Sequence, residues 1–132
     1  TKTDWRILKE NRVVGQAKTV GFNPYYQDAD SIANELTTNL LPLCTDKVTK
    51  VFYYGTGITN DEKAGIIRKA LQVVFEGCEV EAYSDVVGAA RSLCGHEAGI
   101  ACILGTGSNT CYYDGKEIAY RVDALGFWLG DE

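Results

Sequence analysis

The feature that most constrains the fold is a pair of apolar, strand-like runs that each end in a polar loop with two glycines. Residues 48–53 lead into Gly55-Thr56-Gly57, and residues 99–104 lead into Gly105-Thr106-Gly107-Ser108-Asn109. β-Branched and aromatic residues without strict alternation are typical of central strands that are buried on both faces. The sequence therefore predicts an α/β fold whose central strands open directly into loops.

The chain before and between these runs alternates between strand and helix patterns. Apolar and polar residues alternate over residues 1–8 and again over 13–22, which predicts a hairpin with its turn at residues 9–12. Two further segments carry apolar residues at helical spacing, and a third is a run of small residues ended by glycine, so we predict three helices. The predicted helices run from Asp30 to a break at Pro42, from Asn60 to a stop at Gly77, and from Val86 to a stop at Gly95.

Two shorter signals complete the pattern. Residues 78–82 alternate as a short strand, and Asp114-Gly115 indicates a two-residue hairpin turn between residues 110–113 and 117–122. The order of elements predicts a mixed sheet flanked by helices, with a second unit beginning near Gly99.

Composition narrows the classes of function. The chain has 132 residues, of which 45% are hydrophobic, and its net charge of −5 leaves no basic field for nucleic acid. No run approaches the roughly 20 apolar residues of a membrane helix, and the chain does not start with a secretory signal pattern. We therefore expect a cytoplasmic protein without nucleic-acid or membrane partners.

The cysteines are odd in number and include no C-x-x-C pair, which favours reduced thiols in the core over disulfides or a metal site. They are Cys44, Cys78, Cys94, Cys102 and Cys111.

Three features could carry chemistry, and each also has a structural interpretation. Gly105 and Gly107 would let the backbone approach a phosphate, although the loop fits neither G-x-G-x-x-G nor Walker A and a tight turn explains it equally well. Asp85 could act as a general base at the end of a strand, or could cap the helix at Val87 or Gly88. Asn23, before Pro24, is ordinarily a turn former.

His96 is the sole histidine, and we expect it to be a solvated surface residue in a loop.

Four motifs in the same order resemble those of one family. Thr1-Lys2-Thr3-Asp4-Trp5 resembles the end of a phosphate-1 loop, and residues 103–109 resemble a phosphate-2 loop. Residues 83–89 resemble the segment that carries a catalytic aspartate, and residues 126–132 resemble the start of a G-x-x-x-G-D-E-G-S segment. Together they cover essentially the whole chain, which resembles the BadF/BadG/BcrA/BcrD-type ATPase family and, within it, the N-acetylglucosamine kinases.

The resemblance implies a ribonuclease-H-like fold of the actin and hexokinase superfamily, in two copies with nucleotide between them. Residues 1–97 would form the first actin-like ATPase domain without its first strand, and residues 98–132 the start of the second. Asp85 would accept the proton of an amino sugar's 6-hydroxyl group as that group attacks the γ-phosphoryl group of ATP.

The resemblance also implies the ligands, which are ATP, Mg²⁺ and an amino sugar, with N-acetylglucosamine expected ahead of related sugars. The expected phosphate-binding residues are Thr1, Lys2, Gly105, Thr106 and Gly107. The expected sugar-binding residues are Asn23, Ser108, Asn109 and Asp131. No residue is assigned to a metal, and a homodimer is compatible with the resemblance.

The sequence departs from the family pattern at both ends. The aspartate before the phosphate-1 loop and the adenosine-binding part of the second domain are not in it, so we expect this polypeptide to be inactive by itself and to belong to a longer kinase. Two other functions stay open, namely an ATPase activator of an iron–sulfur dehydratase and a non-catalytic sugar-binding regulator.

Overall fold

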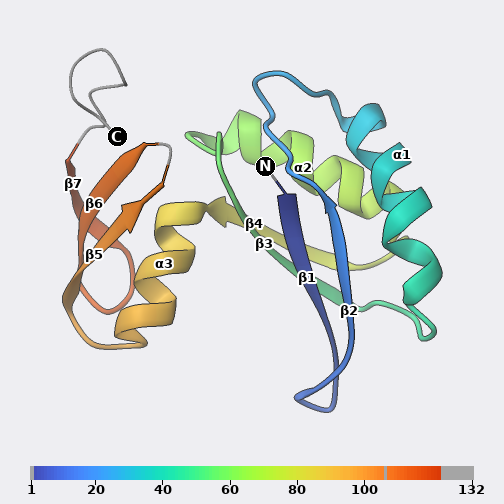
Figure 1. Cartoon of the computed structure of the whole chain (residues 1–132), viewed down its shortest axis with the longest axis horizontal. Helices are drawn as coiled ribbons and strands as arrows, with labels where there is room; N and C mark the ends of the chain where they lie inside the picture. Colours follow the sequence, from blue (N-terminus) through green and yellow to red (C-terminus); the bar gives the residue numbers. More distant parts are fainter. Residues whose placement is uncertain (1, 106, 123–132) are drawn as a thin grey trace. The chain divides into compact units, whose positions relative to one another are not determined.

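The computed structural model of the chain describes residues 2–105 and 107–122, and it is a mixed α/β structure as predicted (Figure 1). It divides into two compact units that meet between Tyr83 and Ser84. The first unit contains β1 (Lys2–Lys9), β2 (Arg12–Val20), α1 (Ala29–Asn39), a 3₁₀ turn (Leu41–Leu43), β3 (Lys50–Gly55), α2 (Asp61–Val74) and β4 (Glu79–Ser84, whose last residue begins the second unit). The second contains α3 (Asp85–Cys94), β5 (Gly99–Leu104), β6 (Ser108–Tyr113) and β7 (Ile118–Val122). The domain boundary expected at residues 97 and 98 stays a prediction.

Strands β1 and β2 form the predicted antiparallel hairpin, with a register that runs from Lys2 opposite Val20 to Lys9 opposite Arg12. Glu10 and Asn11 make the turn with φ angles of 51° and 62°. Two consecutive residues with positive φ match the twist of a two-residue hairpin loop, and asparagine tolerates this conformation better than most residues. The predicted turn at residues 9–12 is therefore confirmed.

Helices α1 and α2 pack against each other in the first unit. Each begins with a side-chain cap, because Asp28 Oδ1 accepts from the Ser31 N–H at 2.8 Å and Asn60 Oδ1 accepts from the Lys63 N–H at 2.9 Å. Their apolar faces supply the largest fully buried side chains of this unit, which are Ile32, Leu36, Ile67 and Leu71. α1 ends at Asn39, and Pro42 lies in the first turn of the 3₁₀ helix that follows, so the helix does not continue through the proline, as predicted.

Strands β3 and β4 are hydrogen-bonded neighbours joined through α2. The Glu79 N–H donates to Thr49 O at 2.9 Å where both strands begin, and the rings of Tyr54 and Tyr83 stack 5.7 Å apart where both end. The two strands are therefore parallel, as a helical crossover requires. Within the described residues the first unit has two two-stranded sheets over one core, so a single continuous ribonuclease-H-like sheet stays a proposal.

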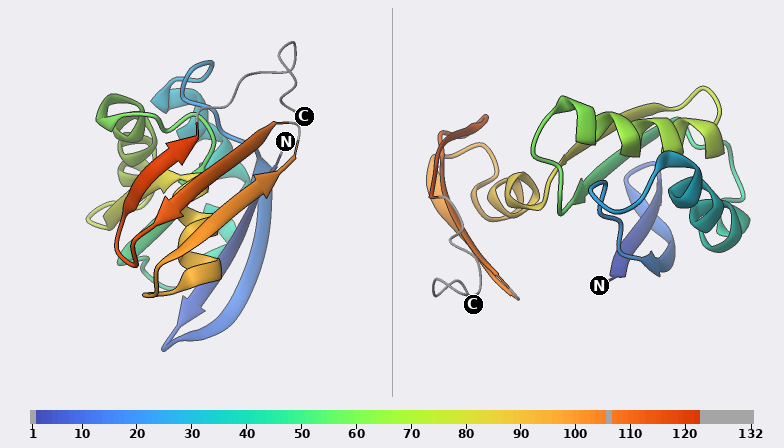
Figure 2. Two further views of the ribbon diagram at one scale, coloured as in Figure 1. Left: turned by 90° about the vertical axis from the view of Figure 1, so that its left-hand side faces the viewer. Right: turned by 90° about the horizontal axis from the view of Figure 1, so that it is seen from above.

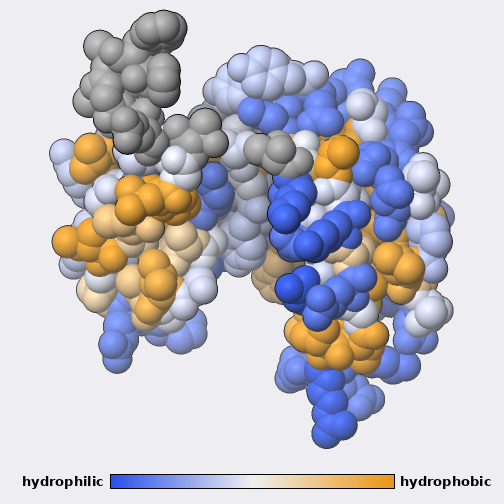
Figure 3. Space-filling model, viewed as in Figure 1, coloured by the Kyte–Doolittle hydropathy of each residue, from blue (hydrophilic) through white to orange (hydrophobic). Residues whose placement is uncertain are grey.

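The second unit is a three-stranded antiparallel sheet, in the order β5-β6-β7, with α3 against one face (Figure 2). Val86 and Ala90 of α3 pack on Ala101, Cys111 and Tyr113. The exposed large apolar side chains of its strands are Ile100, Leu104, Tyr112, Tyr120 and Val122, and the strand register places them on the other face. Hydrophobic residues gather over this unit in Figure 3.

One turn of this unit differs from the sequence prediction. The loop between β6 and β7 has four residues, Asp114 to Glu117, because the Asp114 carboxylate accepts from the N–H groups of Lys116 and Glu117, both at 2.8 Å. The two-residue turn predicted at Asp114-Gly115 is therefore wrong. Gly95 does end α3, with φ of 59°, and His96 is exposed in the loop that follows, both as predicted.

All five cysteines are free thiols. Cys78 and Cys111 are buried, and burial raises the pKa of both thiols. Cys102 is exposed because it lies on the uncovered face of the sheet, so its expected core position is wrong. Over the described ranges, no helix combines the length and apolarity needed to span a bilayer.

Candidate functional site

The loop after β2 holds Asn23 in a fixed position. The Asn23 N–H donates to Gln27 Oε1 at 2.8 Å, and the Asn23 carbonyl accepts from the N–H groups of Tyr26 and Gln27 at 3.0 and 3.1 Å. Its side-chain oxygen accepts from the Tyr25 N–H at 3.0 Å. Asn23 is thus the turn former that the sequence predicts, and its side chain stays half-buried rather than fully enclosed.

The loop after β3 packs against the Asn23 loop. Gly57 has φ of 76°, and a Cβ atom at this position would overlap Asn23 Oδ1 and lie 3.1 Å from Pro24 Cδ. The hydroxyl groups of Tyr25 and Thr59 are 2.8 Å apart and share a hydrogen bond. The first unit therefore brings the predicted sugar-binding asparagine against Gly55-Thr56-Gly57, which the sequence had indicated only as a turn.

Lys63, in the first turn of α2, strengthens this junction. Its ammonium group donates to the Pro24 carbonyl at 3.3 Å and lies 4.5 Å from the centre of the Tyr25 ring. A cation over an aromatic face adds electrostatic attraction to the hydrogen bond. No sequence pattern marked Lys63, because helical spacing places it only on a polar face.

Lys2, the predicted phosphate ligand, begins β1 opposite Val20 and is exposed. Val20 ends β2 and leads into the Asn23 loop, so Lys2 and this loop lie at the same end of the hairpin. Thr1, the other residue predicted from the phosphate-1 motif, lies outside the described residues.

Asp85, the predicted general base, is the first residue of α3 and is partly exposed. Its Oδ1 accepts from the N–H of Val86 at 2.9 Å, so it does not make the predicted caps at Val87 or Gly88. Among the described residues, no other partner of this carboxylate is found. A carboxylate with one oxygen available can accept a proton or bind a cation.

The polypeptide direction places Asp85 and the glycine turn at one end of the second unit. Helix α3 packs on β5 and reaches it through a short loop, so helix and strand run in opposite directions (Figure 1). The N-terminus of α3, where Asp85 lies, is therefore at the end where β5 leads into Gly105. This describes the backbone, and the catalytic role of Asp85 stays a prediction.

The glycine turn is shorter than predicted. The Gly105 N–H donates to Gly107 O at 3.1 Å, and Ser108 pairs with Leu104 and Asn109 with Ile103 in the β5-β6 ladder. The prediction of a loop through Ser108 and Asn109 is therefore wrong, because both belong to β6. The Asn109 side chain accepts from Arg121 Nη2 at 2.6 Å, while Thr106 and Asp131 lie outside the described residues.

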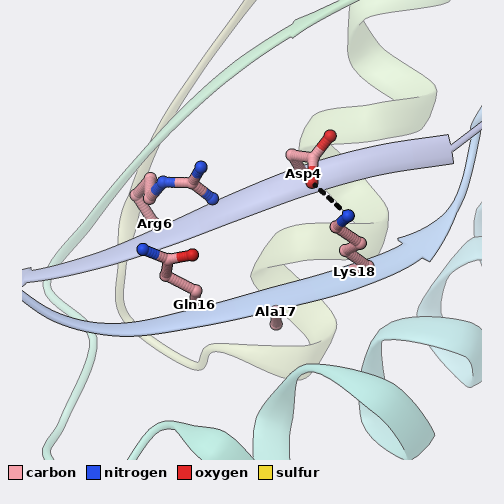
Figure 4. A pocket seen from close by; sticks show the side chains of 5 residues that line it. All are labelled: Asp4, Arg6, Gln16, Ala17 and Lys18. Carbon is pink, nitrogen blue, oxygen red and sulfur yellow. Dashed lines mark ion pairs between the residues drawn. The ribbon is translucent and has the colours of Figure 1, made fainter.

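A polar hollow on the outer face of the β1-β2 hairpin was not predicted. It has a volume of about 290 Å³ and is lined by Asp4, Arg6, Gln16, Ala17 and Lys18 (Figure 4). Lys18 Nζ lies 3.6 Å from Asp4 Oδ1, and Arg6 Nη1 donates to the carbonyl of Trp5 at 3.1 Å. Alternation along both strands was the available signal, since residues two apart share a face and cross-strand partners meet there.

The structure thus defines an α/β chain with polar loops at the ends of its strands, of the kind that bind small ligands. No protein-family model matches the chain, and no curated protein matches it. The chain is similar to the crystal structure of a candidate N-acetylglucosamine kinase from Porphyromonas gingivalis, with 45% sequence identity over 99% of this chain and a TM-score of 0.90. It spans 47% of that protein, about half its length.

Proposed function

We propose that this chain is part of an ATP-dependent sugar kinase that phosphorylates an amino sugar, with N-acetylglucosamine as acceptor at its 6-hydroxyl group. The observation that carries the proposal is the likeness to the candidate N-acetylglucosamine kinase over almost the whole chain, at 45% identity. That likeness favours a kinase over an activator of an iron–sulfur dehydratase or a non-catalytic regulator. The activity belongs to a protein longer than this chain.

The proposed fold is ribonuclease-H-like, of the actin-like ATPase class and the BadF/BadG type. The antiparallel β1-β2 hairpin and the parallel β3-α2-β4 crossover in one unit support it, because both occur in such a mixed sheet. The β5-β6-β7 sheet would then begin the second domain, with the boundary expected at residues 97 and 98.

The side chains and backbone at the proposed site are chemically suited to binding a magnesium–ATP complex. Lys2 offers an exposed ammonium group for phosphate, and the phosphate oxygens of ATP are themselves the kind of ligand that Mg²⁺ prefers. Among the described residues, a Cβ at Gly105 would meet only Gly107 O within 4 Å, at 3.8 Å, so the backbone there is open to close approach. The Gly105 N–H already donates within the turn. Gly105 would therefore contribute to phosphate binding by leaving room for the phosphate beside the backbone, and not by donating a hydrogen bond to it.

In the proposed mechanism, each residue has one task. Asp85 accepts the proton of the sugar hydroxyl through the oxygen that Val86 does not occupy, and Asn23 binds the sugar. Lys2 offsets negative charge on the phosphates, and magnesium–ATP supplies the phosphoryl group. Thr1, Thr106 and Asp131 keep the roles that the family resemblance implies, as do Ser108 and Asn109.

The Asp85→Asn variant of the full-length protein tests this mechanism. Asparagine keeps the oxygen that accepts from Val86 and removes the basic oxygen, so we expect kcat to fall by about 10²- to 10⁴-fold with the fold intact. Asp61→Asn is the matched control, because Asp61 is also the first residue of a helix and its loss should leave kcat unchanged. ADP release with N-acetylglucosamine is the measurement, and unchanged turnover in Asp85→Asn would remove this residue from the mechanism.

A further inference from the structure

We infer that Gly57 is a positioning residue that holds Asn23 with its two amide N–H groups directed to the ligand, so that Asn23 recognises an acceptor oxygen. The inference rests on the proposed function in one respect, which is that a sugar binds at Asn23. The positioning itself depends only on contacts inside the first unit.

The hydrogen bond from Tyr25 settles which way the Asn23 amide points. A backbone N–H can only donate, so the atom 3.0 Å from the Tyr25 nitrogen must be the oxygen Oδ1. The amide nitrogen Nδ2 then lies on the other branch of the side chain. In the described part of the chain nothing accepts a hydrogen bond from Nδ2, and Asn23 is only half-buried, so its two donors are available to a ligand.

Gly57 makes this orientation possible because it leaves room for Oδ1. Any other residue would bring a Cβ into overlap with Oδ1 and to within 3.1 Å of Pro24 Cδ. Proline is rigid and buried, so the Asn23 side chain is the group that would have to move.

The two loops cannot simply separate to relieve such an overlap. The hydrogen bond between Tyr25 and Thr59, at 2.8 Å, and the bond from Lys63 to the Pro24 carbonyl, at 3.3 Å, tie the Asn23 loop to the segment that follows Gly57. The Asn23 backbone is fixed as well, through Gln27. A side chain at position 57 would therefore rotate the Asn23 amide away from its bond to Tyr25.

A side chain that presents only N–H donors selects for an oxygen acceptor. The hydroxyl and N-acetyl carbonyl oxygens of an acetylated amino sugar are acceptors, whereas an ammonium group has only donors. An unpaired polar group in a binding site is costly, so a ligand with no acceptor at this point loses affinity. Asn23 thus adds to the proposed sugar site a contact that is specific for an oxygen acceptor.

The first test compares Gly57→Ala with Gly77→Ala in the full-length protein. Gly77 has the same φ of 76°, and a Cβ there would meet nothing within 4 Å, so its substitution carries the same backbone strain without the overlap. Only Gly57→Ala should shift the Asn23 side-chain amide signals in a nitrogen–proton NMR spectrum. If the Asn23 side-chain amide signals are the same in both variants, the positioning role is overturned, whether or not the protein binds sugar.

The second test uses affinity for N-acetylglucosamine, measured by calorimetry. We expect Gly57→Ala to weaken binding about tenfold or more and Gly77→Ala to leave it unchanged. Asn23→Asp keeps the acceptor for Tyr25 and replaces the donors with an acceptor, so it should weaken binding at least as much. Wild-type affinity in Asn23→Asp would overturn the donor role, whereas a wild-type protein that binds no amino sugar would refute the proposed function and leave the NMR result to decide the positioning role.

A third comparison guards against a Gly57→Ala protein that folds poorly. In an Asn23→Ala background the overlapped oxygen is gone and only the 3.1 Å contact with Pro24 Cδ remains, so Gly57→Ala should lower the thermal unfolding midpoint clearly less than it does in the wild-type background. A penalty at position 57 that persists undiminished without the Asn23 side chain would also contradict the positioning role.

Discussion

Replacing Thr19 by valine should destabilise the first unit, because the buried indole N–H of Trp5 would lose its hydrogen-bond acceptor. Thr19 is 5% exposed and is the buried polar residue of the described chain. Its Oγ1 accepts from Trp5 Nε1 across the β1-β2 hairpin at 3.0 Å, and it donates to the carbonyl of the next residue, Val20, at 3.0 Å. Valine has nearly the same shape, so packing should change little. The Trp5 ring is 8% exposed, and its N–H would lose its acceptor, at a cost of about 1–3 kcal/mol in the free energy of unfolding.

Urea denaturation followed by circular dichroism measures this cost. Thr3→Val is the matched control, because Thr3 lies opposite Thr19 in the hairpin and is only half-buried, so it should change the free energy by no more than about 0.5 kcal/mol. In a Trp5→Phe background no indole N–H is left unpaired, and Thr19→Val should cost about 1 kcal/mol less than in the wild type. An equal cost in both backgrounds would refute the orphaned-donor argument.

Two further predictions concern turns of the second unit. The N–H groups of Glu117 and Lys116 lower the pKa of Asp114, so this carboxylate stabilises the fold above its unfolded-state pKa and the effect is lost as pH falls through the lower folded-state pKa. The Asp114→Ala variant should therefore melt below the wild type at pH 7, with the gap closing in strong acid, and a gap independent of pH would contradict the assignment. Gly105→Ala should leave the melting temperature unchanged, since the added Cβ meets only ordinary contacts, and should raise the KM for ATP by about tenfold. An unchanged KM would separate Gly105 from phosphate binding.

Much of the fold could be predicted because it depends on local chemistry. Periodicity and capping residues located the helices. Asn60 caps the start of α2 and Gly95 caps the end of α3, both as predicted. Sequence patterns were a poor guide where a polar segment gains a partner strand. Ser108 and Asn109 look like loop residues, yet pairing with Leu104 and Ile103 satisfies their backbone groups and extends the ladder through them.

The contact between Gly57 and Asn23 could not be predicted, because it joins loops from separate parts of the chain. The sequence shows only that Asn23 precedes a proline and that Gly57 ends a glycine-containing turn, and both facts are satisfied by a turn alone. The three-dimensional contacts show which glycines are required by packing. A Cβ atom at Gly55 would overlap the Tyr53 side chain, and a Cβ atom at Gly57 would overlap the Asn23 side chain.

The same comparison gives the two glycine motifs different meanings. Side chains of the protein itself fill the space beside Gly55 and Gly57, so these glycines are explained by packing inside the first unit. Gly105 has no such neighbour among the described residues, and its φ lies outside the left-handed region that favours glycine. In the described part of this turn, neither a positive φ nor packing explains Gly105. Close approach of a ligand to the backbone would explain it, so we propose the turn after β5, rather than the one after β3, as the stronger candidate for phosphate binding.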